Sequence, residues 1–170
     1  IISEFASPDE YSFKSTVYNS GSAETDVIEL NAMFSKDGYK IEKSRSGILF
    51  ETVFLDNEGY ITVTDEIRDR QAKHKNGEGI KFEAQCGIPS VEDLADVCRD
   101  IVNSDSDVDQ FTVLLVSKDG IPYYYVSFVY NDIIQKEEFY LSTETGMISE
   151  AYTYINETLV YRYHLDEYSA

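Results

Sequence analysis

Short runs of alternating apolar and polar residues recur along this chain, and they limit its possible folds more than any other feature. Many runs are separated by turns that contain Asp and Gly, as at residues 36–38, 56–59 and 118–120. A spacing of about 8–12 residues between runs is typical of antiparallel strands joined by short connections. We therefore expect about ten strands, at residues 11–18, 26–35, 38–45, 48–55, 59–65, 110–117, 122–130, 135–142, 147–155 and 159–164.

Two segments depart from this alternation in opposite ways. Residues 66–85 carry five of the 14 basic residues and show no sustained period. We expect an irregular excursion there, with a short edge strand near residues 80–82. A solvated loop is the simpler interpretation, and a basic lip that binds an anion is the alternative. Residues 110–117 are apolar on both sides, which indicates a central strand.

A single segment has the period of a helix, from Ser90 to Asn103. Ser90 is a good N-cap, and Asp93 stands three residues later, where a capping box places its acidic partner. Apolar residues then repeat at helical spacing and form one stripe that includes Leu94 and Cys98. A short helix with such a stripe must bury it, and the available surface is a sheet face.

These elements together predict an α+β fold in one domain, residues 1–170, with residues 1–10 as a loose lead-in. Flat sheets of about ten strands are unusual, because such sheets curl, close or split. We expect a strongly curved antiparallel half-barrel of about ten strands, with the one main helix packed on its concave face. Strand alternation predicts that the concave face, together with Leu94, carries the apolar residues Phe13, Phe34, Ile41, Phe50 and Phe54.

The charge of the chain excludes some classes of partner. It has 32 acidic and 14 basic residues, a net charge of −18, which repels nucleic acid and anionic membrane surfaces. No apolar run approaches the roughly 20 residues of a membrane-spanning helix. The chain begins at Ile1 without Met, so we interpret it as a mature or trimmed form whose leader has been removed. We expect a monomer.

No set of residues in the sequence indicates catalysis, a cofactor or a metal, and we expect a protein that is not an enzyme. The two histidines, His74 and His164, have no partner nearby in sequence. Cys86 and Cys98 have two interpretations: buried structural thiols, or a disulfide that ties the loop to the helix. A catalytic thiol is the least favoured.

Several segments resemble the bacterial lipoprotein-carrier half-barrel, the LolA-like family with its Gram-positive and mycobacterial surface-lipoprotein relatives. They are the opening strand Tyr11–Val17, the strand Asp37–Glu42, the strand and turn Glu138–Gly146, and the closing hairpin Leu159–Leu165. The resemblance implies an extracytoplasmic protein, often a lipoprotein on the cell surface. It also implies an apolar cavity between sheet and helix for acyl chains, and no catalytic residues.

Two functions follow from these observations. The first is a non-enzymatic extracytoplasmic domain that holds lipid or the acyl chains of a lipoprotein, with Phe13, Phe34, Ile41, Phe50, Phe54 and Leu94 as the ligand-binding residues. The alternative is a sensory or protein-interaction module at the cell surface, with a filled core and no small ligand. An empty apolar cavity favours the first, and an exposed aromatic patch favours the second.

Overall fold

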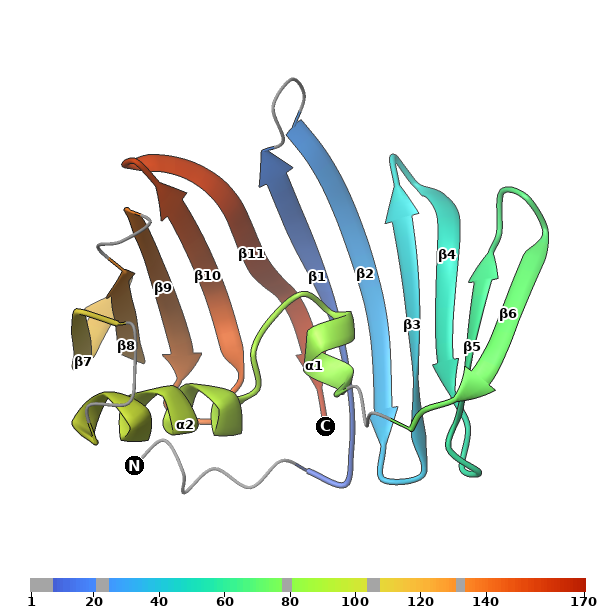
Figure 1. Cartoon of the computed structure of the whole chain (residues 1–170), viewed down its shortest axis with the longest axis horizontal. Helices are drawn as coiled ribbons and strands as arrows, with labels where there is room; N and C mark the ends of the chain where they lie inside the picture. Colours follow the sequence, from blue (N-terminus) through green and yellow to red (C-terminus); the bar gives the residue numbers. More distant parts are fainter. Residues whose placement is uncertain (1–7, 21–24, 78–80, 104–107, 131–133) are drawn as a thin grey trace. The chain divides into compact units, whose positions relative to one another are not determined.

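The fold is a single sheet of eleven antiparallel strands with two short helices, seen in a computed structural model that describes residues 8–20, 25–77, 81–103, 108–130 and 134–170 (Figure 1). The strands are β1 (Glu10–Ser20), β2 (Thr25–Ser35), β3 (Gly38–Arg45), β4 (Ile48–Leu55), β5 (Tyr60–Asp65), β6 (Arg70–Lys75), β7 (Gln110–Lys118), β8 (Ile121–Tyr130), β9 (Gln135–Ser142), β10 (Ile148–Ile155) and β11 (Thr158–Ser169). The helices are α1 (Phe82–Gln85) and α2 (Val91–Val102). The strand order is β6-β5-β4-β3-β2-β1-β11-β10-β9-β8-β7.

The chain divides into two compact units, and the division runs through β1 and β11. The β2–β6 unit comprises Pro8–Val17, Asp26–Gly87 and Leu165–Ala170, and it includes α1. The β7–β10 unit comprises residues 1–7, Tyr18–Thr25 and Ile88–His164, and it includes α2. The expectation of one domain stays a prediction.

In the β2–β6 unit, the register of the strands defines two faces. Ala32 on β2 stands opposite Ile41 on β3, Ile41 opposite Val53 on β4, and Val53 opposite Val63 on β5. Ala32, Ile41 and Val53 are buried, and we call this side the core face. The residues that alternate with them lie on the outer face.

The core face of this unit is filled by aromatic rings. Phe82 of α1 lies with its ring centroid 5.3–5.8 Å from those of Tyr11, Phe13, Phe34 and Tyr39. These spacings suit tilted and edge-on aromatic packing. Helix α1 is a single turn, so it is held mainly by burying Phe82 rather than by its own helical hydrogen bonds.

In the β7–β10 unit the core face follows from the same alternation. Val126 on β8 stands opposite Phe139 on β9, and Phe139 opposite Ala151 on β10, which faces Tyr163 on β11. All four side chains are buried. Tyrosines dominate the other side of these strands.

Helix α2 begins where the sequence predicts. The Ser90 hydroxyl accepts a hydrogen bond from the Asp93 backbone N–H at 3.0 Å, and Asp93 Oδ2 accepts one from the Ser90 N–H at 3.0 Å. This completes the predicted capping box. Leu94 is the buried residue of the helix, whereas most of its apolar stripe is half-buried and Val102 is exposed.

The predicted fold class is wrong. Instead of about ten strands closed into a half-barrel around one main helix, the chain forms an open sheet of eleven strands with edge strands β6 and β7. Strands make up 65% of the described residues and helices 11%. The physical reason is that α2 buries little beyond Leu94, while in the β2–β6 unit the apolar face is filled by rings from its own strands and from α1.

Two local expectations also differ from the structure. Residues 70–75 form the edge strand β6, although all their side chains are exposed, and Phe82–Gln85 form α1 where a short edge strand was expected nearby. The strand at 110–117 is the other edge rather than a central strand. Among the described residues, no helix is long and apolar enough to span a membrane.

Candidate functional site: a hollow on the β2–β6 unit

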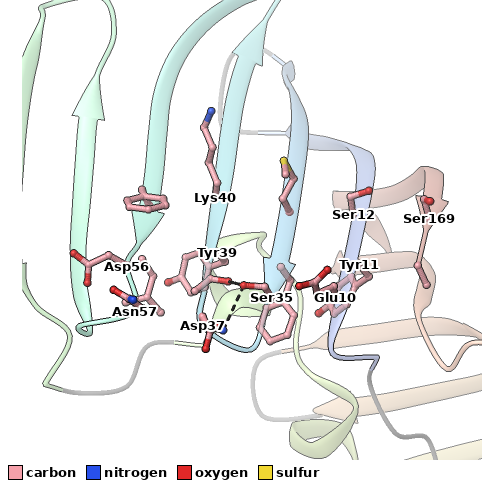
Figure 2. Close-up of a pocket in the computed structure, with 16 residues that line it drawn as sticks. Glu10, Tyr11, Ser12, Ser35, Asp37, Tyr39, Lys40, Asp56, Asn57 and Ser169 are labelled. Atoms are coloured by element: carbon pink, nitrogen blue, oxygen red, sulfur yellow. Dashed lines mark hydrogen bonds between the residues drawn. The ribbon is translucent and has the colours of Figure 1, made fainter.

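The strongest candidate site is a hollow of about 650 Å³ at the end of the β2–β6 unit where β2 turns into β3 and β4 into β5 (Figure 2). Pockets for small molecules commonly measure about 300–1,000 Å³. The hollow is lined by residues of β1 to β4, their turns and the end of β11: Glu10, Tyr11, Ser12, Met33, Phe34, Ser35, Asp37, Gly38, Tyr39, Lys40, Phe54, Leu55, Asp56, Asn57, Ser169 and Ala170.

The floor of the hollow is a row of cross-strand neighbours on the outer face. Met33 stands opposite Lys40, and Lys40 opposite Phe54; these three residues are the floor. The same row continues beyond the hollow to Thr62 and Lys73. Met33 is 56% exposed and Phe54 is 46% exposed, and the two flank Lys40 in one row. Met33 and Phe54 therefore offer an apolar surface that no described residue covers.

Close packing at the β2–β3 turn shapes the hollow. A Cβ atom at Gly38 would lie 2.1 Å from the Leu55 carbonyl oxygen, so β3 and β4 approach closely there only because Gly38 has no side chain. The Ser35 hydroxyl donates a hydrogen bond to the Gly38 carbonyl and accepts one from the Asp37 N–H, each at 3.3 Å (Figure 2). Tyr39 is buried beside them, and burial raises its pKa.

The rim of the hollow is acidic. Its lining carries the carboxylates of Glu10, Asp37 and Asp56 and the ammonium of Lys40, which pairs with Glu42 at 2.6 Å. Lys73 Nζ, outside the lining, lies 3.8 Å from Asp56 Oδ2, so the hollow keeps a net negative charge. Asp56 Oδ1 accepts hydrogen bonds from the backbone N–H groups of Tyr60, at 3.0 Å, and Glu58, at 2.9 Å. The bond from Tyr60 is the main cause of a lowered pKa at Asp56, which therefore stays ionised. This rim suits an uncharged, zwitterionic or cationic head group better than an anion.

Of the residues proposed from the sequence, the structure brings two to the hollow, Phe34 and Phe54. Phe34 lies with the core-face rings, whereas Phe54 lies on the outer face. Phe13 and Ile41 are buried in the core of the unit. Leu94 belongs to the other unit.

Phe54 lies on the opposite face from the one expected, and Phe50 does not line the hollow. Glu51 points to the core face, where its carboxylate meets Lys43 Nζ at 2.7 Å. Because Glu51 and Phe54 lie on opposite faces of β4, Phe54 takes the outer face rather than the concave face expected for it. Phe50 stands at a β-bulge, between Lys43 and Ser44 in register, and its ring lies 4.1 Å from the Arg45 guanidinium carbon.

Sequence reasoning missed Met33 and Lys40 as members of the site. The sequence does contain a signal for Met33. It is an apolar residue that stands between Asn31 and Ser35 on the polar side of β2. Such a side chain becomes informative when a nearby strand adds another exposed apolar side chain, as Phe54 does here, because contiguous apolar patches indicate binding surfaces.

A second feature is a group of tyrosines on the outer face of the β7–β10 unit, which we call the tyrosine surface. Its rings lie 5.1–6.4 Å from their neighbours, and Lys118 Nζ stands 4.7 Å from the Tyr140 ring centroid and pairs with Glu150. The members are half-buried: Tyr123, Tyr125, Tyr140, Tyr152 and Tyr154.

The described residues contain no group of three or more His, Cys, Asp or Glu placed to hold a metal ion. Cys86 is a buried thiol and Cys98 a half-buried one, both free, so the disulfide interpretation is wrong. Burial raises the pKa of the Cys86 thiol, which keeps it protonated and a poor nucleophile.

Comparison with known proteins supports the fold and little else. No protein family model and no curated protein sequence matches this chain. An uncharacterized conserved protein from Thermus thermophilus has a similar structure, with a TM-score of 0.57 and 7% identity over 94% of this chain and 77% of that one. A chain of the Pseudomonas aeruginosa MucA/MucB complex gives a TM-score of 0.52 at 15% identity, and covers 94% of this chain.

The chain spans about half, 51%, of that Pseudomonas chain. A domain described as an outer membrane lipoprotein-sorting protein, from Vibrio parahaemolyticus, matches at a TM-score of 0.37 and 9% identity over 94% of this chain and 84% of that one. The two structures with TM-scores above 0.5, from Thermus thermophilus and Pseudomonas aeruginosa, show a likeness of fold alone.

Proposed function

We propose that this chain is a non-enzymatic, extracytoplasmic binding domain whose ligand is an amphiphile with a single acyl chain, taken up in the hollow of the β2–β6 unit. The ligand could belong to a free lipid or to an acylated lipoprotein, since both present the same chain. The observation that carries the proposal is the pair of exposed apolar side chains, Met33 and Phe54, on the floor of the hollow.

The proposal places the ligand on the outer face, not between sheet and helix. On the core face of this unit, the Phe82 ring packs against four other rings and fills that face. On the outer face an acyl chain would cover Met33 and Phe54. Covering apolar surface stabilises a complex by roughly 25 cal/mol per Å².

The charge of the site selects among head groups. The lining has three carboxylates and one ammonium, and Lys73 lies beside Asp56, so one negative charge remains in excess and an anionic head group would meet net repulsion; the chain as a whole carries −18. We therefore expect a zwitterionic head group to be preferred over a carboxylate. An extracytoplasmic location accords with the segments that resemble lipoprotein carriers, at Tyr11–Val17, Asp37–Glu42 and Glu138–Gly146.

The test is a titration of delipidated protein with three probes that share a twelve-carbon chain, each below its micelle concentration: a lysophosphatidylcholine, dodecanoate and dodecyltrimethylammonium. Calorimetry should show saturable binding of the lysophosphatidylcholine and weaker binding of dodecanoate. Phe54→Asp should weaken the affinity tenfold or more, since burying a Phe side chain is worth about 1.5–3 kcal/mol and a factor of ten is about 1.4 kcal/mol.

Ile48→Asp is the matched control, because Ile48 is 62% exposed at the other end of the same strand and does not line the hollow. It should bind like the parent protein. No saturable binding of any probe, or equal losses in both variants, would remove the hollow as a ligand site.

The alternative function is a protein-interaction module without a small ligand. The tyrosine surface is the observation that favours it, because Tyr is enriched where proteins meet. The MucA/MucB structure is a complex of two proteins, and this chain resembles one of them in fold. If the three probes fail to bind, this function takes precedence.

A further inference from the structure

Strand β7 is an edge of the sheet with the character of an interior strand. It pairs with β8 on one side, and in the strand order of the described residues no strand pairs with its other side (Figure 1). Backbone N–H and C=O groups along such an edge are free to pair with another strand. The edge is nine residues long.

The side chains of β7 are apolar on both faces and exposed on both. In register with buried Val126 and Phe128, the side chains of Val113 and Phe111 lie on the core face with Leu115, whereas Leu114 lies on the outer face beside Tyr125. All four are exposed, and Leu115 reaches 69%. A chain segment added beside β7 would cover apolar surface on both faces.

The opposite edge of the sheet shows how this chain protects an edge. Strand β6 has the sequence Arg-Gln-Ala-Lys-His-Lys, with every side chain exposed. Charged residues, Lys above all, discourage pairing between edges. Between Gln110 and Ser117 the edge strand β7 has no charged residue, so it lacks this protection.

The charges around β7 indicate what the added strand must carry. Asp109 and Asp119 flank the strand, and Lys118 at its end is paired with Glu150. A second copy of the chain would bring another net charge of −18. Net charge of this size keeps proteins apart, so a foreign segment with basic ends fits better.

We propose that β7 binds an extended segment of another protein as an added antiparallel strand. The segment has uncharged, mainly β-branched or apolar side chains at its centre and Lys or Arg at its ends. Main-chain hydrogen bonds to β7 supply affinity, and apolar contacts on both faces supply the choice of partner. This site is separate from the hollow of the β2–β6 unit and does not depend on it.

The probe is a fluorescein-labelled peptide, Lys-Lys-Val-Thr-Val-Leu-Val-Thr-Val-Lys-Lys, compared with a version whose four Lys are Glu and one whose central Leu is Pro. Fluorescence anisotropy should show saturable binding of the first peptide, at least tenfold tighter than that of either comparison peptide. Hydrogen exchange should slow in the amides of residues 110–118 when this peptide is present, because strand addition pairs those groups.

Leu115→Lys places a charge on the edge, as β6 has, and should weaken peptide binding tenfold or more. Ile48→Lys makes the same change at a similarly exposed site on β4 and should leave binding unchanged. Both residues are exposed, so neither change should unfold the protein.

Three results would overturn the proposal. One is the absence of saturable binding of the Lys-flanked peptide, and another is equal binding by the parent protein and Leu115→Lys. The third is sedimentation of the protein alone as a dimer that Leu115→Lys dissociates, which would identify a second copy as the occupant of this edge.

Discussion

Replacing Phe82 with Ala should destabilise the β2–β6 unit more than any other single truncation in α1. Phe82 is 3% exposed, and its ring meets four others. Truncating a buried Phe to Ala costs about 3–5 kcal/mol. Aromatic pairs contribute about 0.5–1.5 kcal/mol each beyond area burial, so we expect the upper part of that range. Such a loss is a large share of the roughly 5–15 kcal/mol that stabilises a typical domain.

The Cys86 thiol can report locally on the loss of packing around α1 that Phe82→Ala is expected to cause. Cys86 lies at the end of α1, where its backbone N–H donates hydrogen bonds to the carbonyls of Phe82, at 3.2 Å, and Glu83, at 3.0 Å. Its side chain is 1% exposed. If Phe82 anchors α1, Phe82→Ala should release the turn and make the Cys86 thiol accessible to a thiol reagent.

The assay is urea unfolding followed by tyrosine fluorescence, since the chain has 14 Tyr and no Trp, together with the rate of thiol labelling in a Cys98→Ser background. Phe82→Leu, which keeps most of the volume, should lose less stability than Phe82→Ala. Ile67→Ala removes an exposed side chain and should stay within about 0.5 kcal/mol of the parent. An unchanged midpoint and unchanged Cys86 labelling in Phe82→Ala would refute the role given to this ring.

Three further predictions concern the β7–β10 unit. Leu94→Ala should cost about 2–5 kcal/mol in urea unfolding, because Leu94 is the buried residue of α2; a shift no larger than that of Val102→Ala would contradict its burial. Ser90→Ala should cost about 0.5–2 kcal/mol, and Ser90→Asn much less, since Asn also caps; equal losses in both would refute the capping role. Burial is the main cause of a raised pKa at Glu137, which accepts hydrogen bonds from Tyr130 Oη at 3.3 Å and Gln135 Nε2 at 3.1 Å. Protonation of Glu137 therefore favours the folded state, and its stabilising contribution is present below pH 4.5 and lost as pH rises through the higher folded pKa. Glu137→Gln should raise the unfolding midpoint at pH 7 and change it little at pH values below 4.5, whereas a lower midpoint at pH 7 would count against this sign.

Most of the strands and the longer helix could be predicted from the sequence because their signals are local. Alternation along β2 and β3 identifies their buried residues, Leu30, Ala32, Tyr39 and Ile41, without knowledge of the partners. The capping box at Ser90 identifies the start of α2 in the same way. The strand at residues 70–75 has no such signal, because β6 owes its extended form to pairing with the backbone of β5.

The candidate site was harder to predict because it depends on which face each residue takes. Strand alternation predicted that Phe54 lies on the concave face. In the folded chain Lys43 lies opposite Glu51 and neutralises it, so the acid takes the core face and Phe54 the outer one. The alternation along one strand cannot show which face a residue takes, because that depends on the residue opposite it on the neighbouring strand. The same limit explains β7, whose apolar sequence favoured a central strand although it forms an edge.

The central claim, that the hollow of the β2–β6 unit binds an acyl chain, can be tested most directly through the two methionines. Met33 lies on the floor of the hollow, and Met147 lies in the other unit and serves as an internal control. With both methyl groups labelled with ¹³C, titration with the twelve-carbon lysophosphatidylcholine should shift the Met33 signal in a saturable way and leave Met147 unchanged. Phe54→Asp should weaken that response, while Ile48→Asp should preserve it. A Met33 signal that does not move, or equal movement of both methionines, would contradict the account.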